Sequence, residues 1–409
     1  MADGSDVAAN EEAARGGDAP RLPAGQTRAD ALRIGLEAVI GTPFVPHNRI
    51  ETLVNGDEIF PAMLSAIRGA KRRVEFLTFV YWQGDIAEAF VRAFIERRQA
   101  GVEVFVMLDG FGGRLIRGDL IDEMKEAGVE VRWFRPLTTL RVWQADNRTH
   151  RKLLIVDGLT GFTGGVGIAE EWEGNAQDPD HWRDNHYRIE GPIVASLRAA
   201  FFDNWIDSTK TIEPLTGCMT DPQPAGDLSV QPVISTAGIG WAAVARLHEA
   251  LCLLAKERIR IATPYFAPRG NQVLRLTQAM ERGVEVEILM PGKHIDKRVS
   301  ELASADEITT LLAAGAKIYR YGPTMFHHKL VSVDGELASI GSANFNMRSA
   351  FKDDELALNV LDRGFCAEAD AIFDRDLEVS ERVGQYKWRK RDLFRRVREK
   401  ASRTFRSEV

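Results

Sequence analysis

Two copies of the pattern H-x-K-x4-D carry the residues best suited to chemistry in this chain. Their six defining residues are His150, Lys152, Asp157, His327, Lys329 and Asp334. Phosphoryl transfer needs this combination, because a histidine can act as nucleophile or general acid while a neighbouring lysine stabilises phosphate charge. Both copies also lead into a glycine-containing stretch. One copy alone would be weak evidence, but two with matching flanks indicate two halves of a single active site.

The spacing within each motif predicts how its side chains point. Residues two apart in an extended chain face the same side, so the histidine and lysine of each motif should project together. Segments 153–156 and 330–333 read as short buried strands. An Asp-Gly pair follows each strand and reads as a tight turn. We therefore expect Asp157 and Asp334 to hold the catalytic motif in shape rather than to touch substrate.

The duplication extends beyond the motif. Three segments of the first half are answered in the same order in the second: 70–74 by 255–259, 101–104 by 283–286, and 127–131 by 314–318. Each half reads as helix, strand, helix, strand, helix, strand and motif, which predicts α/β layering with a mostly parallel or mixed sheet. We divide the chain into a disordered N-terminal tail (1–30), a first domain (31–215), a second domain (216–384) and a basic C-terminal tail (385–409).

The composition of the chain excludes few classes of function, but its charge and cysteine content indicate which partners and which compartment to expect. The chain has 409 residues, a net charge of −6 and a pI near 5.9, so no global charge attracts it to nucleic acid. Its three cysteines show no metal-ligand spacing, and no cofactor or metal is expected. No apolar run has the length of a transmembrane segment, and the N-terminus lacks the features of a signal peptide. We expect a cytoplasmic protein.

The C-terminal tail is the exception to the acidic balance. Residues 387–406 contain ten Lys or Arg, and apolar residues interleave with them at helical spacing. A basic amphipathic helix of this kind can lie on an anionic membrane surface. The alternative is a solvated helix that packs on the body of the protein. We favour the membrane and expect a peripheral protein at the inner membrane face.

The paired motifs resemble those of the phospholipase D superfamily over residues 50–380. Flanking segments resemble bacterial cardiolipin synthases more specifically: 181–186, 188–192, 263–266, 341–349 and Glu355. The resemblance implies two phospholipase D-like α/β domains related by a pseudo-twofold axis. Each would hold a central mixed sheet flanked by helices, and both motifs would meet in one cleft.

The resemblance also implies a ping-pong mechanism without metal. His150 is assigned as the nucleophile that forms a phosphohistidine, and His327 as the general acid and base. Because the two halves are nearly symmetric, the opposite assignment, with His327 as nucleophile and His150 as general acid and base, is also allowed. The two lysines, with nearby Asn and Ser donors, would stabilise the phosphoryl oxygens.

Supporting residues follow from the same resemblance. Glu355 in the second half and Asp184 in the first lie where the family places a carboxylate that orients a histidine. Ser342 and Asn344 are candidate phosphate donors in the second half. The first half has Gly167 where the second has Asn344, so backbone N–H groups, including that of Gly165, are expected to take over there.

The leading function is phosphatidyl transfer that makes cardiolipin from two phosphatidylglycerols with release of glycerol. A phospholipase D that hydrolyses head groups is the first alternative. A nuclease or phosphodiesterase acting on nucleic acid is a further alternative, which the acidic pI and the flanking segments disfavour, and no nucleic-acid partner is expected. A non-catalytic lipid-binding scaffold would be expected to lose motif residues, and both motifs are intact.

Overall fold

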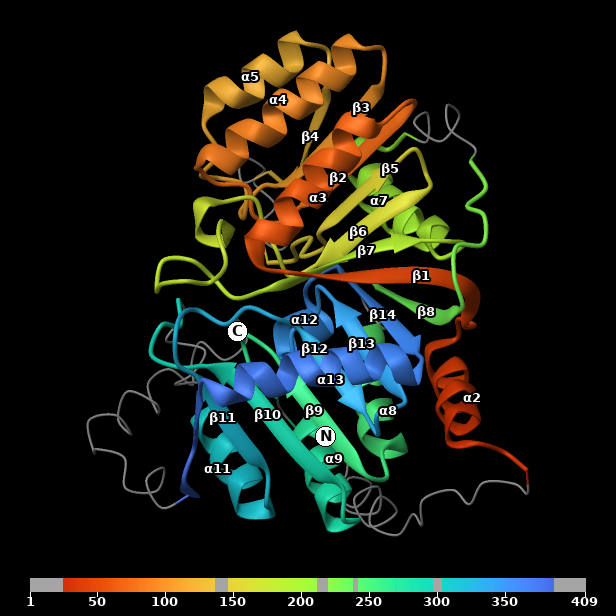
Figure 1. Ribbon diagram of the computed structural model, residues 1–409, viewed down its shortest axis with the longest axis vertical. Coiled ribbons are helices and arrows are strands. Elements are labelled where there is room, and N and C mark those ends of the chain that lie inside the picture. The colour runs from red at the N-terminus through yellow and green to blue at the C-terminus, as the bar shows by residue number, and fades with distance from the viewer. Residues whose placement is uncertain are drawn as a thin grey trace, which may run out of the picture.

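A single sheet of 15 strands forms the centre of the computed structural model, which describes residues 25–136, 146–211, 220–237, 242–268, 270–296 and 304–385. Its strand order is β15-β11-β10-β9-β12-β13-β14-β8-β1-β7-β6-β5-β2-β3-β4. Read outward from the central β8–β1 pair, the two halves have matching orders, with β15 added at one edge. The duplication in the sequence is therefore a pseudo-twofold relation in the fold (Figure 1).

The described residues of the first half form seven strands. They are β1 (Val45–Val54), β2 (Arg73–Thr78), β3 (Glu103–Asp109), β4 (Glu130–Phe134), β5 (Leu153–Val156), β6 (Thr160–Gly164) and β7 (Asn185–Glu190). Its helices are α3 (Asn55–Gly69), α4 (Asp85–Gln99), α5 (Gly118–Glu126), the short 3-10 helix η1 (Glu170–Trp172) and α7 (Val194–Thr209).

The second half repeats this plan. Its strands are β8 (Leu228–Ser235), β9 (Arg258–Ala262), β10 (Glu285–Pro291), β11 (Lys317–Tyr321), β12 (Leu330–Val333), β13 (Leu337–Gly341), β14 (Glu355–Leu361) and β15 (Ser380–Arg382). Its helices are α8 (Ala243–Leu254), α9 (Asn271–Glu281), α11 (Ala305–Ala314), α12 (Met347–Phe351) and α13 (Arg363–Glu378). The predicted mixed α/β class and element order are confirmed.

Each half combines parallel and antiparallel pairing. In the first half β2, β3 and β4 are parallel, as the helical crossovers between them require. The strand within each motif runs antiparallel to its neighbour, β5 against β2 and β12 against β9. The two predicted motif strands occur at the predicted residues, 153–156 and 330–333, and all their residues are buried.

Helices cover both faces of the sheet. An apolar core under α3, α4 and α5 fills one face of the first half, and another under α2 (Arg28–Ile40), α8, α9 and α11 fills the matching face of the second. A third core lies under α7 and α13 and runs across both halves without a break. This shared core and the antiparallel β1–β8 pair fix the halves relative to each other.

Helix α2 belongs in space to the second half. A capping box of Thr27 and Asp30 begins it, so residues 28–30, which we had placed in the tail, form its first turn. It packs beside α8 (Figure 1). Arg28 Nε donates to Asp334 Oδ2 at 2.9 Å. The basic tail from residue 386 lies outside the described residues, as do residues 1–24. Within the described residues, no helix combines the length and apolarity that crossing a membrane requires.

Candidate active site

Both motif histidines lie on extended segments just before a buried strand. Isolated bridges hold these segments at the junction of the halves, Thr149 against Asp354 and Phe326 against Arg183. His150 N donates to Asp354 O at 2.9 Å. Each motif is thus tied to backbone from the other half, and this brings the two copies into one site.

The motif aspartates close the turns after β5 and β12. Asp157 and Asp334 have φ values of 54° and 55°, a left-handed conformation that Asp tolerates better than most residues. The carboxylate of Asp157 accepts the backbone N–H groups of residues 71–73, each at 2.8 Å. Asp334 accepts those of residues 256–258 in the same way. Both carboxylates therefore hold the start of the neighbouring strand against the turn that ends the motif.

Each histidine is held by a carboxylate from the other half. His150 Nδ1 lies 2.9 Å from Glu355 Oε1, and His327 Nδ1 lies 2.7 Å from Asp184 Oδ2. An ionised carboxylate only accepts, so each Nδ1 carries a proton and each Nε2 keeps its lone pair. The two pairs cross the interface, and neither half can form its own histidine–carboxylate pair.

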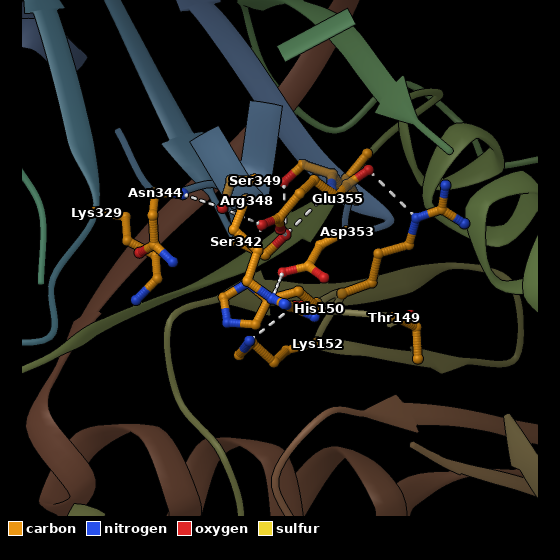
Figure 2. A network of polar contacts seen from close by, with 12 residues as sticks. Thr149, His150, Lys152, Lys329, Ser342, Asn344, Arg348, Ser349, Asp353 and Glu355 are labelled. Atoms are coloured by element: carbon orange, nitrogen blue, oxygen red, sulfur yellow. Dashed lines mark hydrogen bonds and ion pairs between the residues drawn. The ribbon is translucent and has the colours of Figure 1, made fainter. Parts of the chain in front are cut away.

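Different donors support the two carboxylates. Ser349 Oγ donates to Glu355 Oε1 at 2.6 Å, and Ser342 donates to the other oxygen (Figure 2). Asp184 instead accepts Trp172 Nε1 at 3.0 Å. Gly165 leaves the space for Asp184, since a Cβ there would lie 2.2 Å from Asp184 Oδ1. Two serine hydroxyls therefore donate to Glu355. Asp184 instead accepts from an indole N–H group and fits only because residue 165 is a glycine.

These contacts limit which of the candidate phosphate-binding residues can still donate a hydrogen bond to a phosphate. The Ser342 hydroxyl is engaged with Glu355, and the Gly165 N–H donates to Asn185 O at 3.1 Å. Asn344 is buried, and its Oδ1 has no hydrogen-bond partner among the described residues. The unpartnered oxygen of Asn344 is an acceptor, so a hydrogen bond to phosphate would come from its Nδ2, and the residue lies beside Lys329 in Figure 2.

Burial sets the protonation of the site. It is the largest cause that lowers the pKa of His150 to about 4 and that of His327 to about 3. Burial acts in the opposite direction on Glu355 and Asp184, but the facing histidines and lysines outweigh it and lower the pKa of each carboxyl to about 2. At neutral pH the site therefore holds neutral histidines against ionised carboxylates.

The two lysines share one buried site. Lys152 Nζ donates to His150 O, and Lys329 Nζ donates to His327 O, each at 2.7 Å. Burial lowers the pKa of Lys152 to about 7 and that of Lys329 to about 8, and in Lys152 the charge of the other lysine adds to the effect. Like charges in one buried site favour the binding of an anion.

A cavity of about 510 Å³ opens on this centre. Both motif histidines and Lys152 line it, so a ligand there can contact residues of both motifs. Its wall is largely aromatic, formed by Phe79, Trp82, Phe111, Trp172, Trp182 and Tyr265. The His327 ring centroid lies 5.3 Å from that of Trp172 and 5.5 Å from that of Trp182. The described residues contain no cluster of three or more His, Cys, Asp or Glu suited to a metal ion.

Sequence reasoning missed several residues that build the site. Arg151 occupies the variable position of the first motif, is fully buried and donates to Asn204 Oδ1 at 2.8 Å and Ser235 O at 2.9 Å. It therefore pins the motif to α7 and to the strand β8. Trp172 and Ser349 lie at equal distances after their motif histidines, but their residue types differ, so the repeat itself gives no signal for them.

A family model described as "Cardiolipin synthase, PLD-like domain" matches residues 63–178 and 251–377, more than half of the chain. The chain is 31% identical over 342 residues to a protein named cardiolipin synthase A from Pseudomonas syringae, covering 83% of this chain and 71% of that protein. It is 32% identical over 368 residues to cardiolipin synthase 1 from Bacillus cereus, covering 88% and 72%.

Solved structures agree on the fold. A phosphatidylserine synthase from Haemophilus influenzae matches with a TM-score of 0.73 at 16% identity, over 92% of this chain and all of the other. A polyphosphate kinase from Porphyromonas gingivalis matches with a TM-score of 0.55 at 14% identity, over 83% of this chain and 49% of the other. At such identities the likeness concerns the fold alone.

Proposed function

This chain belongs to the phospholipase D-like family of cardiolipin synthases and is a phospholipase D-type phosphatidyltransferase, and we propose that it joins two phosphatidylglycerols into cardiolipin with release of glycerol. The observation that carries the proposal is the crossed arrangement of two histidine–carboxylate pairs on one cavity. Two histidines with complementary roles are what a two-step transfer through a covalent intermediate requires.

In the first step His150 Nε2 attacks the phosphorus of a bound phosphatidylglycerol. The P–N bond forms as the P–O bond to the head-group glycerol breaks, and His327 gives its proton to the departing alkoxide. His150 suits the attack because burial lowers its pKa to about 4 and keeps Nε2 unprotonated, while Glu355 stabilises the positive charge that grows on the ring. Glycerol then leaves.

In the second step a hydroxyl of another phosphatidylglycerol attacks the phosphohistidine. His327 takes the hydroxyl proton, the new P–O bond forms, and the P–N bond to His150 breaks. This returns both histidines to their starting states. Asp184 supports the step because it stabilises His327 whenever that ring is protonated.

Protonation of His327 depends on the substrate. Burial and the lysine charges lower the pKa of His327 to about 3. A phosphodiester placed between Lys152 and Lys329 adds a negative charge, which offsets the lysines and raises that pKa. Binding of the anionic substrate thus favours the protonated form of His327, which acts as the general acid. The lysines stabilise the phosphoryl oxygens, and Asn344 is an additional hydrogen-bond donor.

Ser342 and Gly165 take supporting roles in this proposal. Ser342 acts through Glu355, since its hydroxyl donates to that carboxylate. Gly165 lets Asp184 approach His327, because any larger residue would collide with the carboxylate. Both therefore position catalytic groups instead of binding phosphate directly.

We also propose how the protein reaches its phospholipid substrate. The basic segment 387–406 would lie on the anionic inner face of the cytoplasmic membrane, since each Lys or Arg near such a surface contributes about 1 kcal/mol. This segment is outside the described residues, so its sequence alone supports the proposal.

Product analysis tests the function. Purified full-length protein is incubated with vesicles of labelled phosphatidylglycerol, and lipids and water-soluble products are resolved. We expect cardiolipin and free glycerol in equal amounts. Phosphatidic acid as the main lipid product would show that water is the acceptor, and the protein would then be a hydrolase.

A further inference from the structure

A phospholipid is larger than the cavity that has to receive it. A cavity of about 510 Å³ has the size that encloses a drug-sized ligand, which is enough for the phosphate and glycerol groups. It is too small to enclose the long acyl chains as well. The chains must therefore remain in the lipid bilayer during the reaction, and this requires the mouth of the cavity to meet the bilayer surface.

Residues that line the cavity and are also exposed mark its mouth. Among the described residues these are Phe111, Arg114 and Asp296. Asp296 comes from the second half and accepts a hydrogen bond from Tyr265 Oη at 2.8 Å. Phe111 and Arg114 belong to one loop of the first half, residues 110–117, which joins β3 to α5 (Figure 1). This rim loop therefore forms one side of the mouth.

The backbone of the rim loop is fixed to the site. Asp109 Oδ1, at the end of β3, accepts the N–H groups of Phe111 at 2.8 Å and Gly112 at 3.0 Å. Asp109 Oδ2 accepts the N–H group of Thr149, the residue before the first motif histidine, at 3.2 Å. Trp82 Nε1 donates to Gly112 O at 2.8 Å. The side chains of the loop therefore project from a backbone that is tied to the motif.

The rim loop presents apolar side chains to solvent. Phe111 and Leu115 are each 45% exposed. Single exposed apolar residues are ordinary on a protein surface, but these two share one short loop. Of the exposed large apolar side chains that the structure describes, Phe111 is the one that also lines the cavity. Both side chains would leave water if the loop entered the acyl boundary of a bilayer, which is favourable.

Arg114 suits the same loop to an anionic bilayer. Its guanidinium carbon lies 4.3 Å from the centroid of the Phe111 ring, and its Nη1 donates to Phe111 O at 3.1 Å. Arg117 is paired with Glu88 and Asp119, whereas Arg114 forms no ion pair within the described part of the chain. A cation beside exposed apolar side chains is typical of surfaces that lie on anionic membranes.

We propose that the rim loop is a membrane-docking element, in which Phe111 and Leu115 enter the acyl boundary of an anionic bilayer while Arg114 contacts lipid phosphates. The mouth of the cavity then lies on the bilayer, so a head group reaches the motif histidines while its acyl chains stay in the membrane. The inference rests on the phospholipid substrate of the proposed function, but not on the choice of acceptor. It is separate from the electrostatic contact proposed for segment 387–406.

A fluorophore in the rim loop measures insertion directly. Leu115→Cys is made in full-length protein that also carries Cys218→Ser, and is labelled with an environment-sensitive dye, since Cys252 and Cys366 are buried. The matched control is Leu159→Cys, which is 44% exposed in the turn after β5, at the end of that strand opposite the motif histidine. On vesicles of phosphatidylglycerol and phosphatidylcholine, the dye at position 115 should emit at shorter wavelength and be quenched by brominated acyl chains. The dye at position 159 should not respond.

A second matched pair adds the same charge at equally exposed positions. Leu115→Glu should weaken vesicle binding about tenfold, because a carboxylate that the anionic surface repels replaces an apolar side chain. Leu159→Glu should change binding by no more than about twofold, because salt screens a charge that lies far from the surface. Turnover of Leu115→Glu should fall on vesicles but not on short-chain phosphatidylglycerol dissolved as monomers.

Several results would overturn the inference. One is a dye at position 115 that does not respond to vesicles, or that responds no more than the dye at position 159. Another is equal vesicle binding of Leu115→Glu and Leu159→Glu, which would leave the exposed loop for contact with another protein. If the unaltered protein releases no glycerol from either form of phosphatidylglycerol, the proposed function fails. The dye and the vesicle binding still decide whether the rim loop enters the bilayer.

Discussion

At the scale of single residues, the site depends on pairs that sequence proximity cannot show. The two motifs, Asp184 and Glu355 could be singled out from the sequence, because the motifs repeat and the flanking segments resemble a known family. The partner of each carboxylate could not be foreseen, since the repeat gives no information on which half contacts which. The structure pairs Glu355 with His150 and Asp184 with His327, across the interface.

The lysines provide a prediction at this scale. Lys152→Arg and Lys329→Arg should each lower kcat/KM by at least about a hundredfold, although both keep the positive charge. The site encloses a compact ammonium that also donates to a motif carbonyl, and a planar guanidinium cannot occupy the same space beside a phosphate. Steady-state assays on phosphatidylglycerol vesicles provide the measurement. Near-normal turnover in the double variant would show that the lysines only pack.

The pH dependence of kcat/KM is an independent check on the same residues. Burial lowers the pKa of Lys152 to about 7, so its charge is present below that pH and is lost as the pH rises through it. The kcat/KM of the unaltered protein should therefore decline on the alkaline side from about pH 7 to 8, because this parameter reports the free enzyme. A flat profile up to pH 10 would contradict the role of Lys152.

At the scale of elements, the local sequence pattern predicted secondary structure correctly where the chain repeats a strand followed by a turn. The short strands β5 and β12 were predicted at their observed bounds, because four buried residues followed by Asp-Gly leave little choice. Helix α2 shows the limit of such reasoning. Its capping box and apolar face indicate a helix, but only tertiary contacts decide that it packs on α8 in the other half.

The turn after β5 provides a prediction on stability. Asp157→Asn should lower the free energy of unfolding by about 1–3 kcal/mol, because a neutral amide replaces a carboxylate that accepts three backbone N–H groups. Asparagine tolerates the positive φ, so the backbone itself should not be strained. Denaturant unfolding is the measurement, with Asp122→Asn on the exposed face of α5 as the control. Equal stability of the two variants would contradict the anchoring role of Asp157.

At the scale of the whole molecule, a continuous core joins two related halves into one body. The third apolar core and the β1–β8 pair hold the halves together, so the crossed histidine–carboxylate pairs sit in a fixed frame. Resemblance predicted the pseudo-twofold relation, and the matching strand orders show it.

The basic tail leads to a prediction at this scale. Truncation after Val383 keeps β15 and the hydrogen bond from Val383 N to Ile318 O, so the fold should persist. Binding to anionic vesicles should weaken, and the difference from the full-length protein should shrink at high salt, because salt screens the attraction. Flotation with vesicles at low and high salt is the measurement. Equal flotation of both forms would assign membrane contact to another surface, such as the loop with the exposed Phe111 and Leu115 beside the cavity.

The most direct test of the account is the covalent intermediate. Full-length protein is mixed with labelled phosphatidylglycerol, quenched within a turnover under conditions that preserve phosphohistidine, and mapped by mass spectrometry. We predict a phosphatidyl adduct on His150, no adduct in His150→Ala, and accumulation of the adduct in His327→Asn if the first step still proceeds. Each single variant should lose several orders of magnitude in turnover, with no further loss in the double variant. An adduct found only on His327, or near-normal turnover in His150→Ala, would contradict the assigned mechanism.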